Sequence, residues 1–409
     1  MTTAVCPFDP YAPETVEEPF AFYAWLRREA PIHHLPRAGY HVVSSYELVR
    51  DAALRVDDLS SKIVAVLTAR ADETPEILDL SAMNPIVDVL ATVDPPRHAA
   101  QRRLTNQAVT VDRVSALEDE LRRRAAALVD AAVAAGTTDW MTAFAVALPM
   151  GTITRLLGLP DADIEQLRIW SDSTVATVNG LLDANGFADA ARSAMELAAY
   201  LREHLAAARA ANRDDLVGEL LRNVGPGDDG LTEEEVLSIV FQLFVAGNDS
   251  TASLIGSALR MLVQDAALTA ELRARPERVP AFVEEVLRLH SPFQGHFRVA
   301  LRDLELGGTK IAEGSRLMLL WAAANRDERV FPEPDAVKLD RANGKNHLAF
   351  GVGIHHCIGA TLARRQAAIA IETALARADL APGWSSAPVH IPSLFVRRLT
   401  RLDLTARGR

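Results

Sequence analysis

Cysteine is scarce in this chain, and its scarcity excludes several classes of protein. Only two cysteines, Cys6 and Cys357, occur among 409 residues. They lie far apart and neither belongs to a Cys-x-x-Cys pair, so we expect neither a disulfide framework nor a structural zinc site. Residues 1–20 carry acidic residues and prolines where a signal peptide needs a basic start and an apolar stretch. A protein of the reducing cytoplasm is therefore expected.

Long apolar runs and an excess of positive charge are also missing. No run of about 18 apolar residues occurs, so the sequence predicts no membrane-spanning helix. The chain has 43 Lys and Arg residues against 54 Asp and Glu residues, which gives a formal net charge of −11. Because nucleic acid binding needs a strongly positive surface, this charge disfavours a DNA or RNA partner. An acidic protein partner would need a local basic patch.

Hydrophobic periodicity predicts a mainly helical chain with a minor sheet region, in the α+β class. The chain has neither an internal repeat nor a low-complexity linker, so one large domain over residues 1–409 is expected. Besides a central helix, helices are predicted over residues 113–135, 161–180, 187–212 and 357–375. Strands and mixed strand–helix segments are predicted over residues 39–54, 304–325 and 393–405.

One predicted helix is long and apolar enough to run through the centre of the protein. It opens with Thr232 and Glu235, which have the spacing of a capping box. It continues to about residue 263, so it is about 48 Å long at 1.5 Å per residue. Its middle, Leu237 to Ala246, is apolar almost all round, as is typical of a buried helix.

The same helix contains the polar sequence AGNDST at residues 246–251. Gly247 costs about 1 kcal/mol relative to alanine inside a helix. Asp249, Ser250 and Thr251 are polar groups in a stretch that should be dry. One interpretation is a helix kink whose polar side chains are satisfied locally. The other is a helix that approaches a flat ligand at Gly247 and offers a proton relay.

Helical spacing places these residues on two sides of the helix. Leu243, Gly247, Ser250 and Leu254 are three or four positions apart and share one face. Asp249 is turned by about 100° from Ser250 on a helix of 3.6 residues per turn. The acid is therefore predicted to lie behind the face that carries the serine.

Cys357 lies in the sequence FGVGIHHCIG, residues 350–359, just before a predicted helix. A helix start provides N–H groups and a positive dipole end, which favour a thiolate that can bind iron. Gly351 and Gly353 permit a tight turn, and Gly359 permits close packing of a broad group. Phe350 would cover the sulfur. The alternative is a buried structural cysteine, which is common in proteins.

The sequence FGVGIHHCIG resembles the F-G-x-G-x-H-x-C-x-G haem-binding loop of the cytochromes P-450 and matches it at every defined position. EVLR supplies Glu285 and Arg288 of the E-x-x-R pair of that family, and Arg341 matches the third member of this structural lock. AGNDST resembles the oxygen-activation stretch of its central helix. DPPRHAAQRR, residues 94–103, and Arg298 in HFRVA resemble the segments that hold the haem carboxylates.

The resemblance implies a single, triangular-prism-like cytochrome P-450 domain with haem b between the central helix, about 232–263, and the loop 350–359. Cys357 would ligate the iron through its thiolate. The haem carboxylates carry negative charge, and four residues would hold them by charge-assisted hydrogen bonds: His98, Arg102, Arg298 and His355. The other residues expected at the cofactor are Ala246, Gly247, Phe350, Gly351 and Gly359.

The resemblance also implies a monooxygenase that inserts one atom of O2 into a lipophilic small molecule, by hydroxylation or epoxidation. Asp249, Ser250 and Thr251 would supply protons. Serine stands at position 250 where the family usually has threonine, so either hydroxyl is open as the relay. A monomer that receives electrons from a ferredoxin and its reductase is expected. A basic docking patch is predicted at Arg103, Arg113, Arg364 and Arg365, whereas Arg122 to Arg124 are predicted to form a solvated helix face.

A mostly apolar substrate pocket is predicted from the segments that surround such a haem. Its candidate walls are Ile86, Val87, Leu243, Ala246, Phe293, Gln294, His296, Leu394 and Phe395. Terpenoids, steroids, fatty acids and macrolides fit such walls. Two other functions stay open: a haem protein that senses a gas or ligand, and a haem-thiolate enzyme driven by peroxide.

Overall fold

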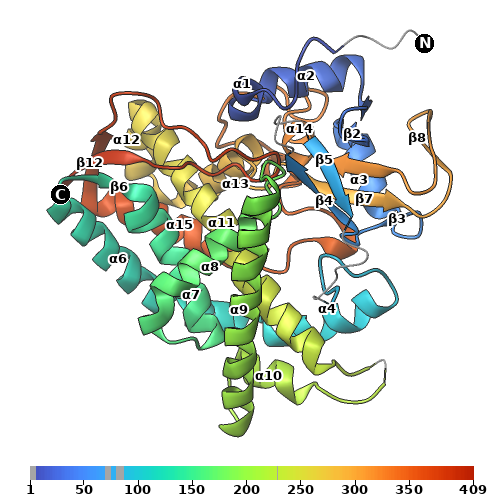
Figure 1. Ribbon diagram of the computed structural model, residues 1–409. Helices are drawn as coiled ribbons and strands as arrows, with labels where there is room; N and C mark the ends of the chain where they lie inside the picture. Colours follow the sequence, from blue (N-terminus) through green and yellow to red (C-terminus); the bar gives the residue numbers. More distant parts are fainter. Residues whose placement is uncertain (1–5, 70–74, 80–86, 228) are drawn as a thin grey trace.

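The structure is a computed structural model of the chain, and it describes residues 6–69, 75–79, 87–227 and 229–409. Most of the long helices gather on one side of the molecule, while the larger sheet lies on the other side with the first helices of the chain (Figure 1). The helices are α1 Pro13–Glu17, α2 Phe20–Glu29, α3 Tyr46–Leu54, α4 Arg97–Ala108, α5 Val111–Ala116, α6 Glu118–Ala135, α7 Ala147–Leu157, α8 Ile164–Ala176, α9 Ala184–Ala210, α10 Leu216–Arg222, α11 Glu233–Gln264, α12 Ala266–Ala274, α13 Val279–Leu289, α14 Trp321–Ala324 and α15 Ala360–Arg377.

The larger sheet has the strand order β1-β2-β10-β7-β3. β10 pairs in parallel with β2 and antiparallel with β7, where Leu317 is opposite Arg298. These strands are β1 Ile32–Leu35, β2 Tyr40–Val43, β3 Leu59–Ser60, β7 His296–Ala300 and β10 Arg316–Leu319. The register carries Arg298 into the interior, where only 7% of its surface is exposed.

Three smaller sheets complete the strands of the described residues. One has the order β11-β12-β6 and joins the end of the chain to the helical side. The other two are hairpins. The strands are β11 Ala378–Pro382, β12 Asp403–Gly408 and β6 Thr137–Asp139 in the first, and β4 Ala65–Ala69 with β5 Pro75–Asp79 and β8 Leu304–Leu306 with β9 Thr309–Ile311 in the hairpins.

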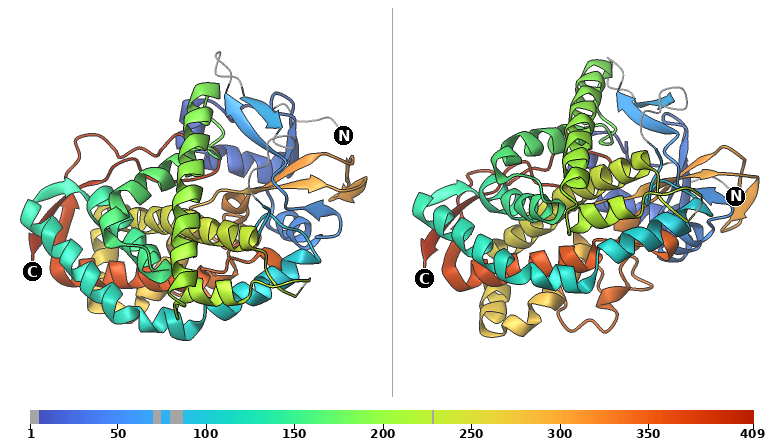
Figure 2. Two further views of the ribbon diagram at one scale, coloured as in Figure 1. Left: turned by 60° about the horizontal axis from the view of Figure 1, so that its bottom comes forward. Right: turned by 90° about the horizontal axis from the view of Figure 1, so that it is seen from below.

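The predicted central helix is confirmed as α11. The Thr232 hydroxyl accepts a hydrogen bond from the Glu235 N–H at 3.1 Å, and the Glu235 carboxylate accepts one from the Thr232 N–H at 2.8 Å. The two bonds form the capping box that the spacing predicted. α11 contacts α7, α8, α9, α13 and α15, and the long helix α9 crosses it in both views of Figure 2.

Two hydrophobic clusters meet along α11. Up to Phe244 its side chains pack with α7, α9 and α10, and from Leu254 onward they pack with α6, α13 and α15. Each large apolar side chain buried in such a cluster contributes about 1.5–3 kcal/mol. The polar stretch 246–251 therefore lies between two rigid regions, in a position where its geometry is well defined.

Several predicted boundaries need correction. The helix predicted over 113–135 is divided into α5 and α6, and the helix over 161–180 ends earlier, at Ala176. The strand predicted over 393–405 begins only at Asp403, with isolated bridges from Val396 to Phe293 and from Leu399 to His390. Before Asp403 the segment pairs only briefly with residues 292–294 and 389–391, so it does not form a continuous strand. None of the described helices combines the length and apolarity needed to cross a bilayer.

Candidate active site

The cysteine loop is a tight turn that requires glycine at two positions. Gly351 and Gly353 have φ angles of 68° and 76°, in the left-handed region that other residues rarely adopt. The Cys357 N–H donates to the Phe350 carbonyl at 2.9 Å and closes the turn. The prediction that these glycines shape the loop is confirmed. The helix α15 begins at Ala360, three residues beyond the cysteine.

Cys357 has an exposed side chain, so the prediction of a cysteine available to a ligand is favoured over a buried structural one. The surrounding protein still displaces enough water to raise the pKa of the thiol, against the lowering effects of the Gly359 N–H, Arg102 and Arg364. The sequence predicted a lowered pKa. Desolvation outweighs the helix start here, and a bound metal ion would supply the missing stabilisation of the thiolate.

A group of basic side chains lies beside this loop, and none of them pairs with a carboxylate of the described residues. The rings of His98, in α4, and His355 have their centroids 4.5 Å apart. The Nε2 atom of His98 is buried and has no hydrogen-bond partner among the described residues. Arg298 donates to the Phe297 carbonyl at 2.7 Å but forms no ion pair within the described part of the chain, and desolvation lowers its pKa to about 10. A buried polar atom without a partner and a buried cation without a counter-charge are both costly, so they fit an anionic group that is not protein.

The neighbours of this cluster explain its charge state. Desolvation together with nearby Arg298 lowers the pKa of His355 to about 4, although its Nδ1 donates to the Leu90 carbonyl at 3.1 Å. A bound anion would favour the protonated imidazole, which can also donate from Nε2. The charge of Asp94 acts on Arg298 and His355, but its carboxylate accepts from the Ser60 hydroxyl at 2.5 Å and from the Ser61 N–H at 2.9 Å. His296 belongs to the same group: desolvation and Arg298 lower its pKa to about 4. The sequence placed His296 in the substrate pocket and missed this second position.

Arg102 is placed differently from the other predicted carboxylate partners. Its guanidinium donates to the His356 carbonyl at 2.6 Å, so it contacts the cysteine loop directly. It lies one helical turn from His98 on α4. The structure therefore brings His98, Arg298 and His355 together and ties Arg102 to the segment beside Cys357.

One stripe of α11 is open, while most of that helix is buried. Ala246 is exposed, and Leu243, Gly247 and Ser250 are half-buried. Leu254, predicted on the same face, is 1% exposed and belongs to the core. The Ser250 and Thr251 hydroxyls donate to the carbonyls of Ala246 and Gly247 at 2.8 and 3.0 Å. The helix continues through this stretch. The two hydroxyls are satisfied by carbonyls of the same helix, which is the local satisfaction that the first interpretation predicted.

Asp249 lies behind this stripe, as its helical position predicted. Its residue surface is 1% exposed, and one carboxylate oxygen lies 2.5 Å from the guanidinium of Arg398. The same Arg398 nitrogen lies 2.9 Å from Asp172, in α8. Desolvation raises the pKa of Asp249, Arg398 opposes that rise, and Asp172 adds to it. The sequence held no local signal for Arg398 or Asp172, because both come from distant segments.

The predicted triad of Glu285, Arg288 and Arg341 is present and buried. The Glu285 carboxylate accepts from Arg288 at 2.8 and 2.9 Å and from Arg341 at 3.0 Å. Arg288 also donates to the carbonyls of Pro334 and Ala336 at 2.5 and 2.9 Å. The triad therefore ties α13 to the chain that leads into the cysteine loop.

The predicted pocket walls fall into separate places. Leu243 and Ala246 lie on the open stripe of α11, Val87 is 42% exposed, and Ile86 lies outside the described residues. Gln294 is buried and accepts a hydrogen bond from the Tyr23 hydroxyl at 2.6 Å. The remaining predicted wall residues contact other parts of the fold. Leu394 and Gln294 line a pocket that contains none of the α11 residues. Phe395 packs on Phe297, and Phe293 packs on His296.

The predicted basic docking patch is neutralised by internal ion pairs. Each of its four arginines lies close to an acid of the same chain, so the segment offers less free positive charge than the sequence suggested. The pairs are Arg103–Asp229 at 3.3 Å, Arg113–Glu219 at 2.7 Å, Arg364–Glu284 at 2.7 Å and Arg365–Glu118 at 2.6 Å.

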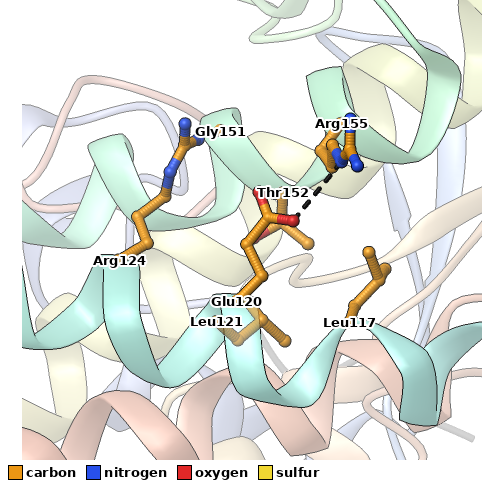
Figure 3. Close-up of a pocket in the computed structure, with 7 residues that line it drawn as sticks. All are labelled: Leu117, Glu120, Leu121, Arg124, Gly151, Thr152 and Arg155. Atoms are coloured by element: carbon orange, nitrogen blue, oxygen red, sulfur yellow. Dashed lines mark ion pairs between the residues drawn. The ribbon is translucent and has the colours of Figure 1, made fainter.

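Another pocket lies between α6 and α7, and it contains none of the predicted site residues. Figure 3 shows its lining residues, with Glu120 paired to Arg155 at 3.3 Å. The guanidinium of Arg124 occupies the space where a Cβ atom at Gly151 would lie. This pocket results from helix packing and contributes nothing to the arrangement around Cys357.

Comparisons with known proteins give the relationships of the chain. Residues 187–400 match the family described as Cytochrome P450. The chain is 35% identical over 402 residues to Cytochrome P450 144 of Mycobacterium tuberculosis, with 97% of this chain and 91% of that protein covered. CYP109Q5 from Chondromyces apiculatus is similar in structure, with a TM-score of 0.85, 34% identity and 98% of both chains covered.

A further solved structure is CYP109E1 from Bacillus megaterium in complex with testosterone. It has a TM-score of 0.81 and 28% identity, with 95% of this chain and 99% of that chain covered. The similarity extends over nearly the whole chain in sequence as well as in fold. The chain therefore belongs to the cytochrome P450 family of monooxygenases, whose members hold iron protoporphyrin IX through a cysteine thiolate.

Proposed function

We propose that Cys357 is the thiolate ligand of the haem iron and that the enzyme inserts one atom of O2 into a lipophilic small molecule. The observation that carries this proposal is the exposed Cys357 side chain in a loop shaped by left-handed Gly351 and Gly353. His98, Arg298 and His355 would hold the haem carboxylates. Among the described residues the buried Nε2 atom of His98 has no hydrogen-bond partner and the buried Arg298 has no acidic partner, and both observations support this assignment.

Bound haem supplies the iron at which dioxygen is reduced. The chain provides the surroundings of that iron. The open stripe of Leu243, Ala246, Gly247 and Ser250 would form one wall of the site and keep bulk water away from it. Cys357 would hold the iron as a thiolate and contribute electron density to it.

Proton delivery is assigned to Asp249 and Ser250. Ser250 lies on the open stripe, whereas Thr251 is 3% exposed and faces the protein interior. Asp249 would receive protons from the side of α8, where Arg398 holds it beside Asp172. Ser250 is therefore the better placed of the two hydroxyls to pass a proton to the open side of α11, and Thr251 would stabilise the helix through its bond to Gly247.

The substrate is proposed to be a compact lipophilic molecule of about the size of a steroid. The apolar residues of the α11 stripe support a lipophilic ligand, and the structurally similar CYP109E1 was solved with testosterone. Electrons are proposed to come from a ferredoxin and its reductase. Because the four arginines of the predicted patch are paired internally, docking would depend on other groups around the cysteine loop. A monomeric, cytoplasmic enzyme remains our expectation.

The proposal is tested by replacing Cys357 with serine in the full chain. We expect the purified wild-type protein to bind haem and to give the ferrous–CO absorption band for which the family is named, and Cys357→Ser to lose that band. Retention of the band in the variant would contradict the assignment. Steroids and other lipophilic candidates are then screened by the Soret shift that accompanies substrate binding.

NADPH consumption and product formation with surrogate ferredoxin partners test the reaction itself. Product formation that depends on NADPH and O2 supports the monooxygenase. Ligand binding without turnover would favour a sensor, and turnover with peroxide alone would favour a peroxide-driven enzyme.

A further inference from the structure

Two neighbouring acids on α13 are centres of separate ionic clusters. Glu285 belongs to the triad described above, and Glu284, which is 6% exposed, contacts a different pair of residues. Its carboxylate accepts from Arg364, in α15, at 2.7 and 3.1 Å, and it lies 3.0 Å from Nε2 of His347. Desolvation raises the pKa of Glu284, but the hydrogen bonds from His347 and Arg364 outweigh it and lower that pKa to about 2.

His347 connects Glu284 to the start of the cysteine loop. Its Nδ1 atom accepts a hydrogen bond from the Ala349 N–H at 3.2 Å. An imidazole nitrogen that accepts carries no proton, so the other nitrogen is the N–H that donates to Glu284. The His347 side chain is fully buried. The backbone directly before Phe350 is thus fixed from α13.

Arg364 connects Glu284 to the ring that begins the loop. The guanidinium carbon lies 4.4 Å from the centroid of the Phe350 ring, within the range of a cation–π interaction. The Phe350 carbonyl accepts the hydrogen bond from the Cys357 N–H. Arg364 was predicted to serve a docking patch. Its planar group is instead held between a buried carboxylate and an aromatic face.

We propose that Glu284 is a positioning residue for the cysteine loop: it holds Arg364 against Phe350 and His347 against Ala349. The arrangement is an ion pair whose positive end, the Arg364 guanidinium, lies on the Phe350 side, toward the cysteine loop, and it keeps the loop in its turn. Reduction of the iron adds negative charge, which a nearby cation stabilises. Arg364 therefore raises the reduction potential of the bound haem. This inference rests on the proposed ligand, Cys357.

The charge effect is tested with the ferric–ferrous midpoint potential of the haem-loaded full chain. We expect Arg364→Gln to lower the potential and Arg364→Lys, which keeps the charge without the fork geometry, to give an intermediate value. The matched control is Arg365→Gln, because Arg365 is the neighbouring arginine and pairs with Glu118 at the surface. Equal shifts in Arg364→Gln and Arg365→Gln, or no shift in either, would overturn the proposal.

The positioning effect is tested with the rate of haem loss and the ferrous–CO spectrum. Residues behind a metal ligand typically change metal affinity by about 10- to 100-fold. We expect Glu284→Gln to lose haem faster by a factor in this range and Glu118→Gln to behave like the wild type. Equal rates of haem loss in the two variants would contradict the role of Glu284. If Glu284→Gln fails to fold, the potentials of the Arg364 variants still decide.

The wild-type protein separates this inference from the proposed function. A wild type that binds no haem refutes the proposed function. A wild type with a normal ferrous–CO band, together with variants that match their controls, refutes this inference alone.

Discussion

Arg398 and Asp249 form an ion pair in which a guanidinium nitrogen lies 2.5 Å from a carboxylate oxygen. The two residues belong to segments far apart in the chain. Their side chains are 14% and 2% exposed, so the pair is shielded from solvent. Through Asp172 the same nitrogen reaches α8. Arg398 thus links the carboxylate of Asp249, in α11, to that of Asp172, in α8.

Replacement of Arg398 should weaken proton delivery. In Arg398→Gln the buried carboxylate loses its counter-charge, so the pKa of Asp249 rises above its already raised value. We expect less product per NADPH consumed and a pH optimum displaced upward, with Arg398→Lys closer to the wild type. Removing one partner of a buried pair also costs about 3–5 kcal/mol of stability.

The control for this prediction is Arg401→Gln, in the same segment. Arg401 is 67% exposed and pairs with Asp403 at 2.7 Å. Its product yield and pH profile should match the wild type. An unchanged pH profile in Arg398→Gln would show that Asp249 does not depend on this guanidinium.

Ser250 and Thr251 should differ in the effect of their removal. Ser250→Ala takes a hydroxyl from the open stripe, so we expect a lower ratio of product to NADPH and more peroxide released. Thr251→Ala removes a buried hydroxyl whose bond is internal to the helix, so we expect a loss of about 1 kcal/mol in stability with the product ratio preserved. A larger loss of coupling in Thr251→Ala would reverse the assignment.

The Glu285 triad should dominate the stability of the region before the cysteine loop. Glu285→Gln leaves Arg288 and Arg341 without their shared acid in a site that is at most 5% exposed. The expected loss is about 3–5 kcal/mol in the free energy of unfolding, measured with denaturant. The surface variant Glu333→Gln breaks the exposed pair with Lys338 and should have little effect. Similar midpoints for the two variants would count against a structural role of the triad.

Acid should weaken the start of α11 through Glu235. Desolvation raises the pKa of this carboxyl, but hydrogen bonds from Arg97, Thr232 and Gln101 outweigh it and lower the pKa to about 2. The pKa of Glu235 is therefore lower in the folded protein than in the unfolded chain, where it is near 4.5. The ionised carboxylate stabilises the folded protein above pH 4.5, and this stability is lost as the pH falls from 4.5 toward 2.

Thermal unfolding at several pH values tests this expectation. Glu235→Gln should be less stable than the wild type at neutral pH by a few kcal/mol, and the difference should narrow between about pH 4.5 and 2. A difference that stays constant over this range would show that Glu235 does not titrate as described.

Most of the correct structural predictions concern residues that are close together in the sequence. The capping box of Thr232 and Glu235 joins residues three apart, and the left-handed Gly351 and Gly353 serve a turn of only a few residues. The position of Asp249 behind Ser250 followed from helical geometry alone. In each case the residues that interact are close in the chain, so their spacing fixed their arrangement.

Long-range partners could not be predicted in the same way. Arg398 lies in a segment whose alternation suggested a strand, although before Asp403 it forms only isolated bridges, and its side chain reaches Asp172 of α8 and Asp249 of α11. Arg364 was assigned to a docking patch because nothing near it in sequence indicated Glu284. Gln294 was assigned to a pocket wall, and nothing near it in sequence indicated its hydrogen bond with Tyr23. These contacts depend on the tertiary fold, which brings distant segments together.

The order of Asp249 and Arg398 along the chain has a consequence for biosynthesis. Asp249 emerges from the ribosome well before the cation that neutralises it, so the nascent central helix carries an unpaired acid until Arg398 has followed. Burial of that acid as an ion pair must wait for this later segment. We therefore expect the core around α11 to close only after Arg398 has emerged, and polypeptides stalled before Arg398 to remain targets for chaperones.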